Sequence, residues 1–166
     1  METKEQLTEA QEKLKGKLKD IKIAMLTTEE PDGDLRSRPM STSEMDEDGC
    51  LWFFTNEFSP KVNEINQEHK VNLSYANPDD NTYVSVSGQA VLSTDKSKIK
   101  ELWNPILKAW FPEGLDDPKL ALLKITPRQA EYWDSTSSKV IQFYNIAKAI
   151  VTGERHNSGE NKKVNF

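Results

Sequence analysis

The feature that most constrains the fold is a series of five short segments with the composition of β-strands, separated by turn residues. The longest segment, TYVSVSGQAVLS, alternates polar and apolar residues, as a strand with one buried face does. Because most connections between the segments are short enough for tight turns, we predict an antiparallel β-barrel. The five predicted strands are residues 20–28, 35–43, 51–56, 70–77 and 82–93.

The rest of the chain predicts one more strand and helices around the barrel. Residues 121–134 have the composition of a sixth strand, with a bend at Pro127. Apolar residues at helical spacing predict helices within residues 4–19, 99–110 and 140–151. We therefore expect a single, mainly β domain over residues 1–152 with N-terminal and C-terminal helices. A polar, mobile tail is expected at residues 153–166.

Composition excludes several classes of partner. Among 166 residues there are 22 Lys and Arg against 27 Asp and Glu, which gives a net charge of -5. This balance disfavours nucleic acid or an anionic membrane as the partner. No apolar run approaches the roughly 20 residues that a membrane-spanning helix needs, and the N-terminus lacks an apolar signal core. A single cysteine, Cys50, forms no internal disulfide and suits a reducing compartment, so we expect a cytoplasmic protein.

The stretch from residue 36 to residue 65 carries the features of a phosphate site. Ser59 and Pro60 are typical of a helix start, and Lys61 follows in the first turn. A helix N-terminus presents N–H groups and a positive dipole end, so a hydroxyl and an ammonium group placed there could hold a phosphate. An ordinary helix cap beside a solvated lysine explains the same spacing. Pro39 places its predicted strand at a sheet edge, where backbone groups could meet a ligand.

Other chemistry is poorly supported by the sequence. The two histidines, His69 and His156, belong to no cluster with metal-ligand spacing, so we predict no metal site. The acidic run from Asp46 to Asp48 is typical of a solvated turn. No nucleophile elbow, Walker A motif or dinucleotide-binding glycine pattern is present. A phosphate site and an edge strand on a barrel suit a cofactor that brings its own reactivity.

Six sequence runs, in their order and spacing, resemble a known family over roughly residues 20–135. The first three resemble the flavin-binding split β-barrel superfamily, whose best-known member is pyridoxamine 5′-phosphate oxidase. They are RPM at 38–40, DGCLWFFTN at 48–56 and S-x-K at 59–61. The other three resemble the bacterial general stress protein branch of that superfamily. They are YVSVSGQA at 83–90, WFPEGLDDP at 110–118 and AEYWD at 130–134.

The resemblance implies a six-stranded antiparallel split β-barrel, a homodimer, and FMN bound in the groove between the subunits. Carried over by position, Arg38 and Lys61 would hold the FMN phosphate, and Ser59 and Thr55 would add hydrogen bonds. The ribityl chain and ring would lie along the backbone of Pro39, Met40 and Ser41, and of Phe54 and Thr55.

Three aromatic residues complete the implied cofactor site. Tyr83 stands where the oxidase has a glutamine, so a direct amide contact to flavin is not expected. Trp110 and Trp133 would close the pocket and could do so from the partner subunit. Near the C-terminus the only arginines are Arg128 and Arg155, and the oxidase's cationic substrate clamp is not recognisable there. That oxidase activity is therefore not expected.

Three functions stay open on the sequence alone. The first is an FMN-dependent oxidoreductase of unknown substrate in the general stress response, reduced by a nicotinamide cofactor. The second is a non-catalytic flavin carrier or sensor. The third is a barrel that binds no flavin and acts through its dimer surface. The sequence assigns no catalytic residue and does not choose firmly between FMN and a deazaflavin.

Overall fold

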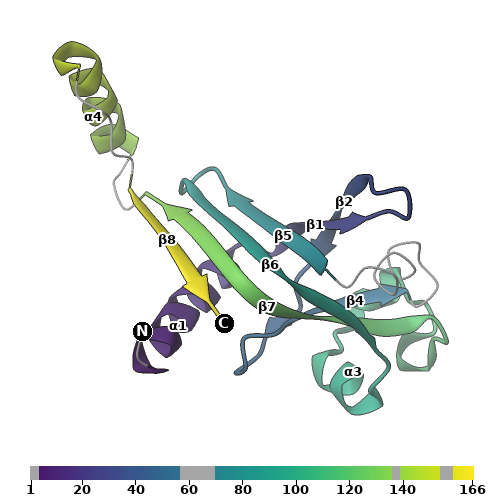
Figure 1. The fold of residues 1–166 in the computed structure, drawn as a ribbon. Coiled ribbons are helices and arrows are strands. Elements are labelled where there is room, and N and C mark those ends of the chain that lie inside the picture. The colour runs from purple at the N-terminus through teal and green to yellow at the C-terminus, as the bar shows by residue number, and fades with distance from the viewer. Residues whose placement is uncertain (1–3, 57–69, 136–138, 154–158) are drawn as a thin grey trace.

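The computed structural model describes residues 4–56, 70–135, 139–153 and 159–166. Within these ranges, eight strands form one antiparallel sheet that curls into a half-open barrel (Figure 1). The strands are β1 (Ile23–Glu29), β2 (Leu35–Ser41), β3 (Glu44–Met45), β4 (Leu51–Asn56), β5 (Lys70–Asn77), β6 (Thr82–Ser93), β7 (Leu120–Asp134) and β8 (Glu160–Asn165). The helices are α1 (Lys4–Asp20), α3 (Lys96–Leu102) and α4 (Lys139–Thr152), with the short 3-10 helices η1 (Pro105–Ala109) and η2 (Gly114–Asp116).

The order of the strands leaves the barrel open along one side. The sheet runs β2-β1-β5-β6-β7-β4-β3, and β8 pairs with β7 outside this path. Only Thr42 and Ser43 separate β2 from β3, although these strands lie at opposite ends of the order. The sheet therefore bends back on itself, and β2 approaches β4 without pairing with it. We call the gap between β2 and β4 the seam. The predicted mainly β split barrel is confirmed, with two short strands beyond the six expected.

A bend in β6 and β7 gives the sheet its curvature. The pairing register shifts between Ser87 and Gly88, opposite Pro127, as the positions of these residues in the sequence predict. Gly88 has no room for a side chain, because a Cβ atom there would lie 2.3 Å from the carbonyl oxygen of Thr126. The first half of β7 pairs with β4 and the second half pairs with β8. One bent strand therefore joins β4, which borders the seam, to the outer strand β8.

Two apolar clusters fill the structure. The larger occupies the barrel interior, and α1 covers it through Ala10, Leu14 and Leu18, which recur every four residues on one helix face. The smaller packs α3 and the loops after it against β4 and β7, with Ile99 and Phe111 at its centre. These clusters fix α1 on one side of the seam and α3 on the other.

The C-terminal segment differs from the prediction. Residues 160–165 form β8 along β7, where a mobile polar tail was expected. Val164 is buried, and the backbone N–H of Phe166 donates to the carbonyl oxygen of Arg128 at 3.1 Å. An outer strand that buries a single side chain can be almost entirely polar, which explains why composition alone did not indicate it.

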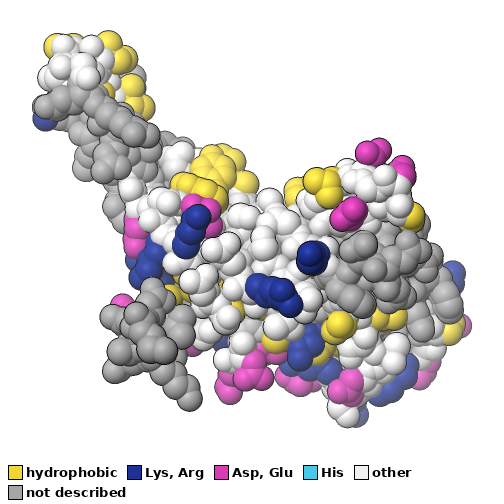
Figure 2. Space-filling model, in the orientation of Figure 1, with side chains coloured by type: hydrophobic (Ala, Val, Ile, Leu, Met, Phe, Trp, Pro, Cys, Tyr) yellow, Lys and Arg dark blue, Asp and Glu magenta, His cyan; other side chains and the backbone are white. Residues whose placement is uncertain are grey.

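The helix α4 forms where the apolar stripe predicts it, between β7 and β8. In Figure 1 it projects away from the barrel, and Figure 2 shows exposed hydrophobic side chains on it and on the barrel nearby. Ile150 on this helix is 78% exposed. Among the helices that the structure describes, none is long and apolar enough to cross a membrane.

Candidate functional site

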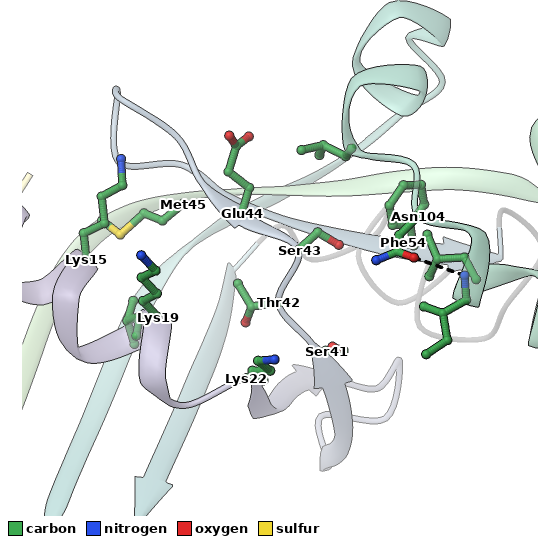
Figure 3. Close-up of a pocket in the computed structure, with 14 residues that line it drawn as sticks. Lys15, Lys19, Lys22, Ser41, Thr42, Ser43, Glu44, Met45, Phe54 and Asn104 are labelled. Carbon is green, nitrogen blue, oxygen red and sulfur yellow. Dashed lines mark hydrogen bonds between the residues drawn. The ribbon is translucent and has the colours of Figure 1, made fainter.

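A pocket of about 600 Å³ opens beside the seam (Figure 3). Its walls come from the C-terminal half of α1, the connector between β2 and β3, Phe54 of β4, and the segment from Leu102 to Leu107. The connector is fixed at both of its residues, because Thr42 N–H donates to the carbonyl of Lys22 and Ser43 N–H donates to that of Trp52. The pocket is therefore built on hydrogen-bonded backbone at the open edge of the sheet.

Arg38 lies on the β2 side of the seam. It pairs in register with Leu26 and shares the inner face of the strand with buried Met40. Its Nη1 donates to the hydroxyl of Thr28 at 2.5 Å, and Thr28 is only 1% exposed. A guanidinium carries five N–H donors in a planar fork that suits a phosphate group. The sequence therefore places an oriented cation at the edge strand.

Thr55 lies on the β4 side of the seam. By strand alternation it shares the inner face with Leu51 and Phe53, both of which belong to the barrel core. Its side chain is 3% exposed, and the hydroxyl oxygen has no hydrogen-bond partner among the residues that the structure describes. A buried hydroxyl without a partner costs about 1–3 kcal/mol. Such an atom is a natural contact point for a ligand.

The structure places the other β2 and β4 candidates around the same seam. Pro39 and Ser41 lie on the outer face of the edge strand, and Met40 is buried in the barrel core. Phe54 faces the pocket and contacts Trp103 edge-on, with ring centroids 6.1 Å apart. Ser59 and Lys61, the predicted phosphate ligands after β4, lie outside the described residues.

Of the three aromatic candidates, two lie on the outer face of the sheet away from β2, and the third follows η1. Tyr83 and Trp133 are cross-strand neighbours on the outer face of the sheet, 41% and 42% exposed. The strand of Tyr83 is separated from that of Arg38 by β1 and β5, which at ~4.8 Å per strand is roughly 14 Å. Trp110 follows η1 and is 70% exposed. None of the three lines the pocket beside the seam.

A buried tyrosine of β5 contacts the connector and stays neutral. The hydroxyls of Tyr75 and Thr42 lie 2.8 Å apart. Burial raises the pKa of Tyr75 to about 12, although its hydrogen bond with Thr42 works in the opposite direction. This phenol therefore positions the connector and does not exchange protons near neutral pH. Within the described residues no group of three or more His, Cys, Asp or Glu side chains could hold a metal ion.

Comparison with known proteins assigns the family. The model of the pyridoxamine 5′-phosphate oxidase like family matches residues 9–157. The chain belongs to this family. The protein bli-3 of Neurospora crassa is 31% identical over 143 residues, which are 80% of this chain and 68% of that protein.

Solved structures place the chain in the general stress protein branch of the pyridoxamine 5′-phosphate oxidase like family. General stress protein 26 from Jannaschia sp. CCS1 is 28% identical, with a TM-score of 0.76 over 95% of this chain and 99% of that chain. The general stress FMN/FAD binding protein of Xanthomonas citri is 32% identical, with a TM-score of 0.68 over 78% of this chain and 92% of that chain. The expected branch is thereby confirmed.

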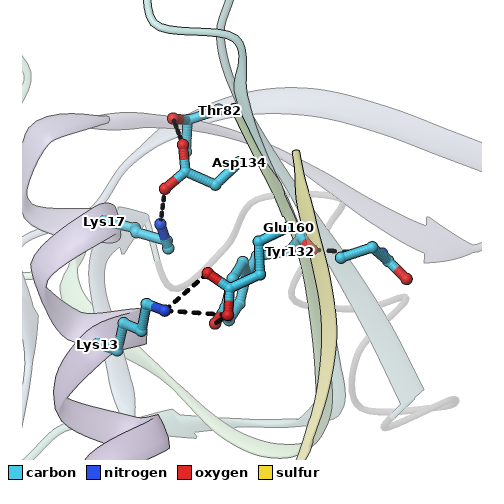
Figure 4. A network of polar contacts seen from close by, with 7 residues as sticks. Lys13, Lys17, Thr82, Tyr132, Asp134 and Glu160 are labelled. Carbon is cyan, nitrogen blue, oxygen red and sulfur yellow. Dashed lines mark hydrogen bonds and ion pairs between the residues drawn. The ribbon is translucent and has the colours of Figure 1, made fainter. Parts of the chain in front are cut away.

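Sequence reasoning missed the charged groups of α1 and of the residues just after it. Lys15 and Lys19 of α1, and Lys22 between α1 and β1, line the pocket at the seam. Lys13 and Lys17, on another face of the same helix, join a separate polar network with β7 and β8 (Figure 4). The spacing of four residues within each pair was the available signal, because such residues share a helix face.

The network in Figure 4 fastens α1 to the C-terminal strand. Lys13 pairs with Glu160 at 2.7 Å, and the hydroxyl of Tyr132 donates to the same carboxylate at 3.0 Å. The hydrogen bond to Lys13 lowers the pKa of Glu160, and the same bond raises the pKa of Lys13. Lys17 pairs with Asp134 at the end of β7. The contacts of Glu160 join β8 to α1 and β7, in addition to the pairing of β8 with β7 and the burial of Val164.

Proposed function

We propose that this member of the pyridoxamine 5′-phosphate oxidase like family binds FMN at the seam and acts as a flavin-dependent oxidoreductase. The observation that carries the proposal is the buried hydroxyl of Thr55, which lacks a partner among the described residues. It lies across the seam from Arg38, and the resemblance assigns both positions to the cofactor. The FMN/FAD binding protein of Xanthomonas citri shares the fold at 32% identity.

The residues present fit a flavin mononucleotide. Arg38, together with Lys61 and Ser59 outside the described ranges, would hold the phosphate through charge-assisted hydrogen bonds. The edge of β2 from Pro39 to Ser41 offers backbone groups that no further strand pairs within the described sheet. Thr55 would then gain the partner that its hydroxyl lacks. When bound, the flavin would supply hydride and electron transfer, and the protein would bind it, orient it and exclude water.

A homodimer would complete the site. The outer face of the sheet exposes Ile23 and Met25 of β1 together with Tyr83 and Trp133 on β6 and β7. An apolar face of this kind on a soluble barrel is a candidate for contact with a second subunit. A two-fold axis would bring each subunit's aromatic residues towards the seam of the other and create two equivalent sites. In this arrangement Trp110 and Trp133 serve the partner's flavin.

The phosphate assignment is tested with Arg38→Gln. Its matched control is Arg36→Gln, two residues earlier on the same strand, where Arg36 is exposed and approaches Glu30 at 3.5 Å. Loss of one charge-assisted contact, worth about 1.5–3 kcal/mol, should weaken FMN by roughly tenfold to a hundredfold in Arg38→Gln. Riboflavin, which has no phosphate, should be affected much less. Equal FMN affinity in the two variants would remove Arg38 from the site.

A second candidate function is a flavin carrier or sensor without turnover. Tyr75, the buried phenol beside the seam, has a pKa near 12 and is no acid or base at neutral pH, but hydride transfer to a flavin requires none, so both functions stay open. Anaerobic mixing of the flavin-loaded protein with NADH or NADPH separates the two functions. Rapid loss of the oxidised flavin band supports the oxidoreductase. Reduction by dithionite but by neither nicotinamide donor supports the carrier or sensor.

A further inference from the structure

The pocket beside the seam has two chemically different walls. One wall is apolar and includes Phe54, Leu102, Ile106 and Leu107. The other carries the ammonium groups of Lys15, Lys19 and Lys22 and the hydroxyls of Ser41, Thr42 and Ser43 (Figure 3). A volume of about 600 Å³ lies in the range of small-molecule sites. The pocket is thus suited to a ligand with one apolar part and one polar part.

The polar wall carries a local excess of positive charge. Within the described part of the chain, Lys15, Lys19 and Lys22 form no ion pair, whereas Lys13 and Lys17 on another face of α1 are both paired. Three ammonium groups therefore face one pocket in a protein whose net charge is -5. The local charge is positive although the net charge of the whole protein is negative, and this favours an anionic ligand.

Among the described residues that line the pocket, the single acidic side chain is already neutralised. Glu44 pairs with Lys98 at 2.7 Å. Burial lowers the pKa of Lys98, but its hydrogen bonds to Glu44 and Glu101 outweigh this effect and raise the pKa overall. The carboxylate of Glu44 is therefore held by a stable cation that is not one of the three lysines. Their charge stays available to a ligand.

The hydroxyls of the connector lie beside these cations in a fixed geometry. The hydrogen bond from Thr42 N–H to the carbonyl of Lys22, at 2.9 Å, joins the end of α1 to the connector. Ser41 and Ser43 flank Thr42 and also line the pocket. A fixed backbone reduces the ordering cost of binding, and hydroxyls can donate to an anionic oxygen beside the lysines.

We infer that this pocket binds a small organic anion, with its carboxylate or phosphate on Lys15, Lys19 and Lys22 and its apolar body against Phe54. The binding inference stands on the pocket alone. That such an anion is the substrate of the flavin rests on the proposed function. The pocket and the seam share the end of β2 at Ser41, so a molecule bound here would lie next to the proposed cofactor.

The experiment compares three probes by calorimetry: 1-naphthyl phosphate, inorganic phosphate and 1-naphthol. The proteins are wild type, a variant with Lys15, Lys19 and Lys22 all changed to Gln, and a control variant with the same loss of charge. In the control, Gln replaces three exposed lysines that lie outside the pocket lining: Lys96, Lys100 and Lys119. FMN binding to each protein is measured separately, as is FMN binding to Arg38→Gln.

We expect 1-naphthyl phosphate to bind wild type and the control equally, and the pocket variant at least tenfold more weakly. Inorganic phosphate and 1-naphthol should each bind wild type at least tenfold more weakly than 1-naphthyl phosphate does. Equal binding to the pocket variant and the control would overturn the inference, as would binding of inorganic phosphate as tight as that of the whole probe.

The FMN measurements separate this inference from the proposed function. If no protein binds FMN but the probe still depends on the three pocket lysines, the proposed function fails and the inference stands. If FMN binds every protein except Arg38→Gln, and 1-naphthyl phosphate binds the pocket variant as tightly as wild type, the inference fails and the proposed function stands. If the pocket variant loses FMN while Arg38→Gln keeps it, the pocket holds the flavin phosphate, and the inference is overturned.

Discussion

Replacing Thr55 by valine should change stability and cofactor affinity in opposite directions. The Thr55 hydroxyl is buried without a partner among the described residues, and valine has nearly the same shape without the hydroxyl. Since an unpaired buried hydroxyl costs about 1–3 kcal/mol, the flavin-free variant should gain a free energy of unfolding of that order. For a chain of this length, each 1 kcal/mol corresponds to roughly 2–4 °C in Tm.

The same substitution should weaken FMN binding. A neutral hydrogen bond contributes about 0.5–1.5 kcal/mol, so the loss of the Thr55 contact should reduce affinity by roughly twofold to tenfold. The assay is thermal unfolding with and without saturating FMN, together with a fluorescence titration of the flavin. We expect a higher Tm without FMN and a smaller increase in Tm when FMN is added.

Thr28→Val is the matched control, because this hydroxyl is equally buried but accepts a hydrogen bond from Arg38 at 2.5 Å. Its removal should lower the free energy of unfolding by about 1–3 kcal/mol. The reasoning would be refuted if Thr55→Val destabilised the flavin-free protein as Thr28→Val does and left FMN affinity unchanged. The Thr55 hydroxyl would then have a partner within the protein.

Three further predictions follow from the barrel itself. Tyr75 has its pKa raised to about 12 from 10.0, so its stabilising effect is complete below pH 10 and is lost as the pH rises towards 12. Denaturant unfolding of Tyr75→Phe should therefore show a smaller loss of stability across that range. Gly88→Ala should lower the free energy of unfolding by at least about 1–3 kcal/mol, because the added Cβ would meet the carbonyl of Thr126; an unchanged denaturation midpoint would contradict this. Met25→Glu should dissociate the proposed dimer in light scattering without loss of far-ultraviolet circular dichroism, and an unaltered dimer would move the interface elsewhere.

The sequence predicted the strands of the barrel well because each is defined by local alternation. Residues 82–93 and 121–134 show this best, and even the bend at Gly88 and Pro127 could be located from residue type. The strand at 160–165 was not predicted. Its pairing depends on β7, on the burial of Val164 and on the ion pair of Glu160 with Lys13, all of which are contacts between distant parts of the chain.

The candidate site could also be predicted only in part from the sequence. The resemblance could indicate Arg38 and Thr55 by position, and the structure places them on the two strands that flank the seam. Alternation placed Tyr83 on the polar face of its strand, but it could not show how far that strand lies from Arg38, because this depends on the strand order. Nor could it show that alternate lysines of α1 face different partners. Lys15 lines the pocket while Lys17 pairs with Asp134, a difference set by how the helix packs on the barrel.

We propose above that a two-fold dimer of this chain binds one FMN per subunit at the seam. The most direct measurement is size-exclusion chromatography of FMN-loaded protein with simultaneous light scattering and visible absorbance. We expect a mass twice that of the single chain, with the oxidised flavin band co-eluting at one flavin per chain. A peak at the mass of one chain that still carries flavin would contradict the shared site, and a protein peak without flavin would contradict cofactor binding.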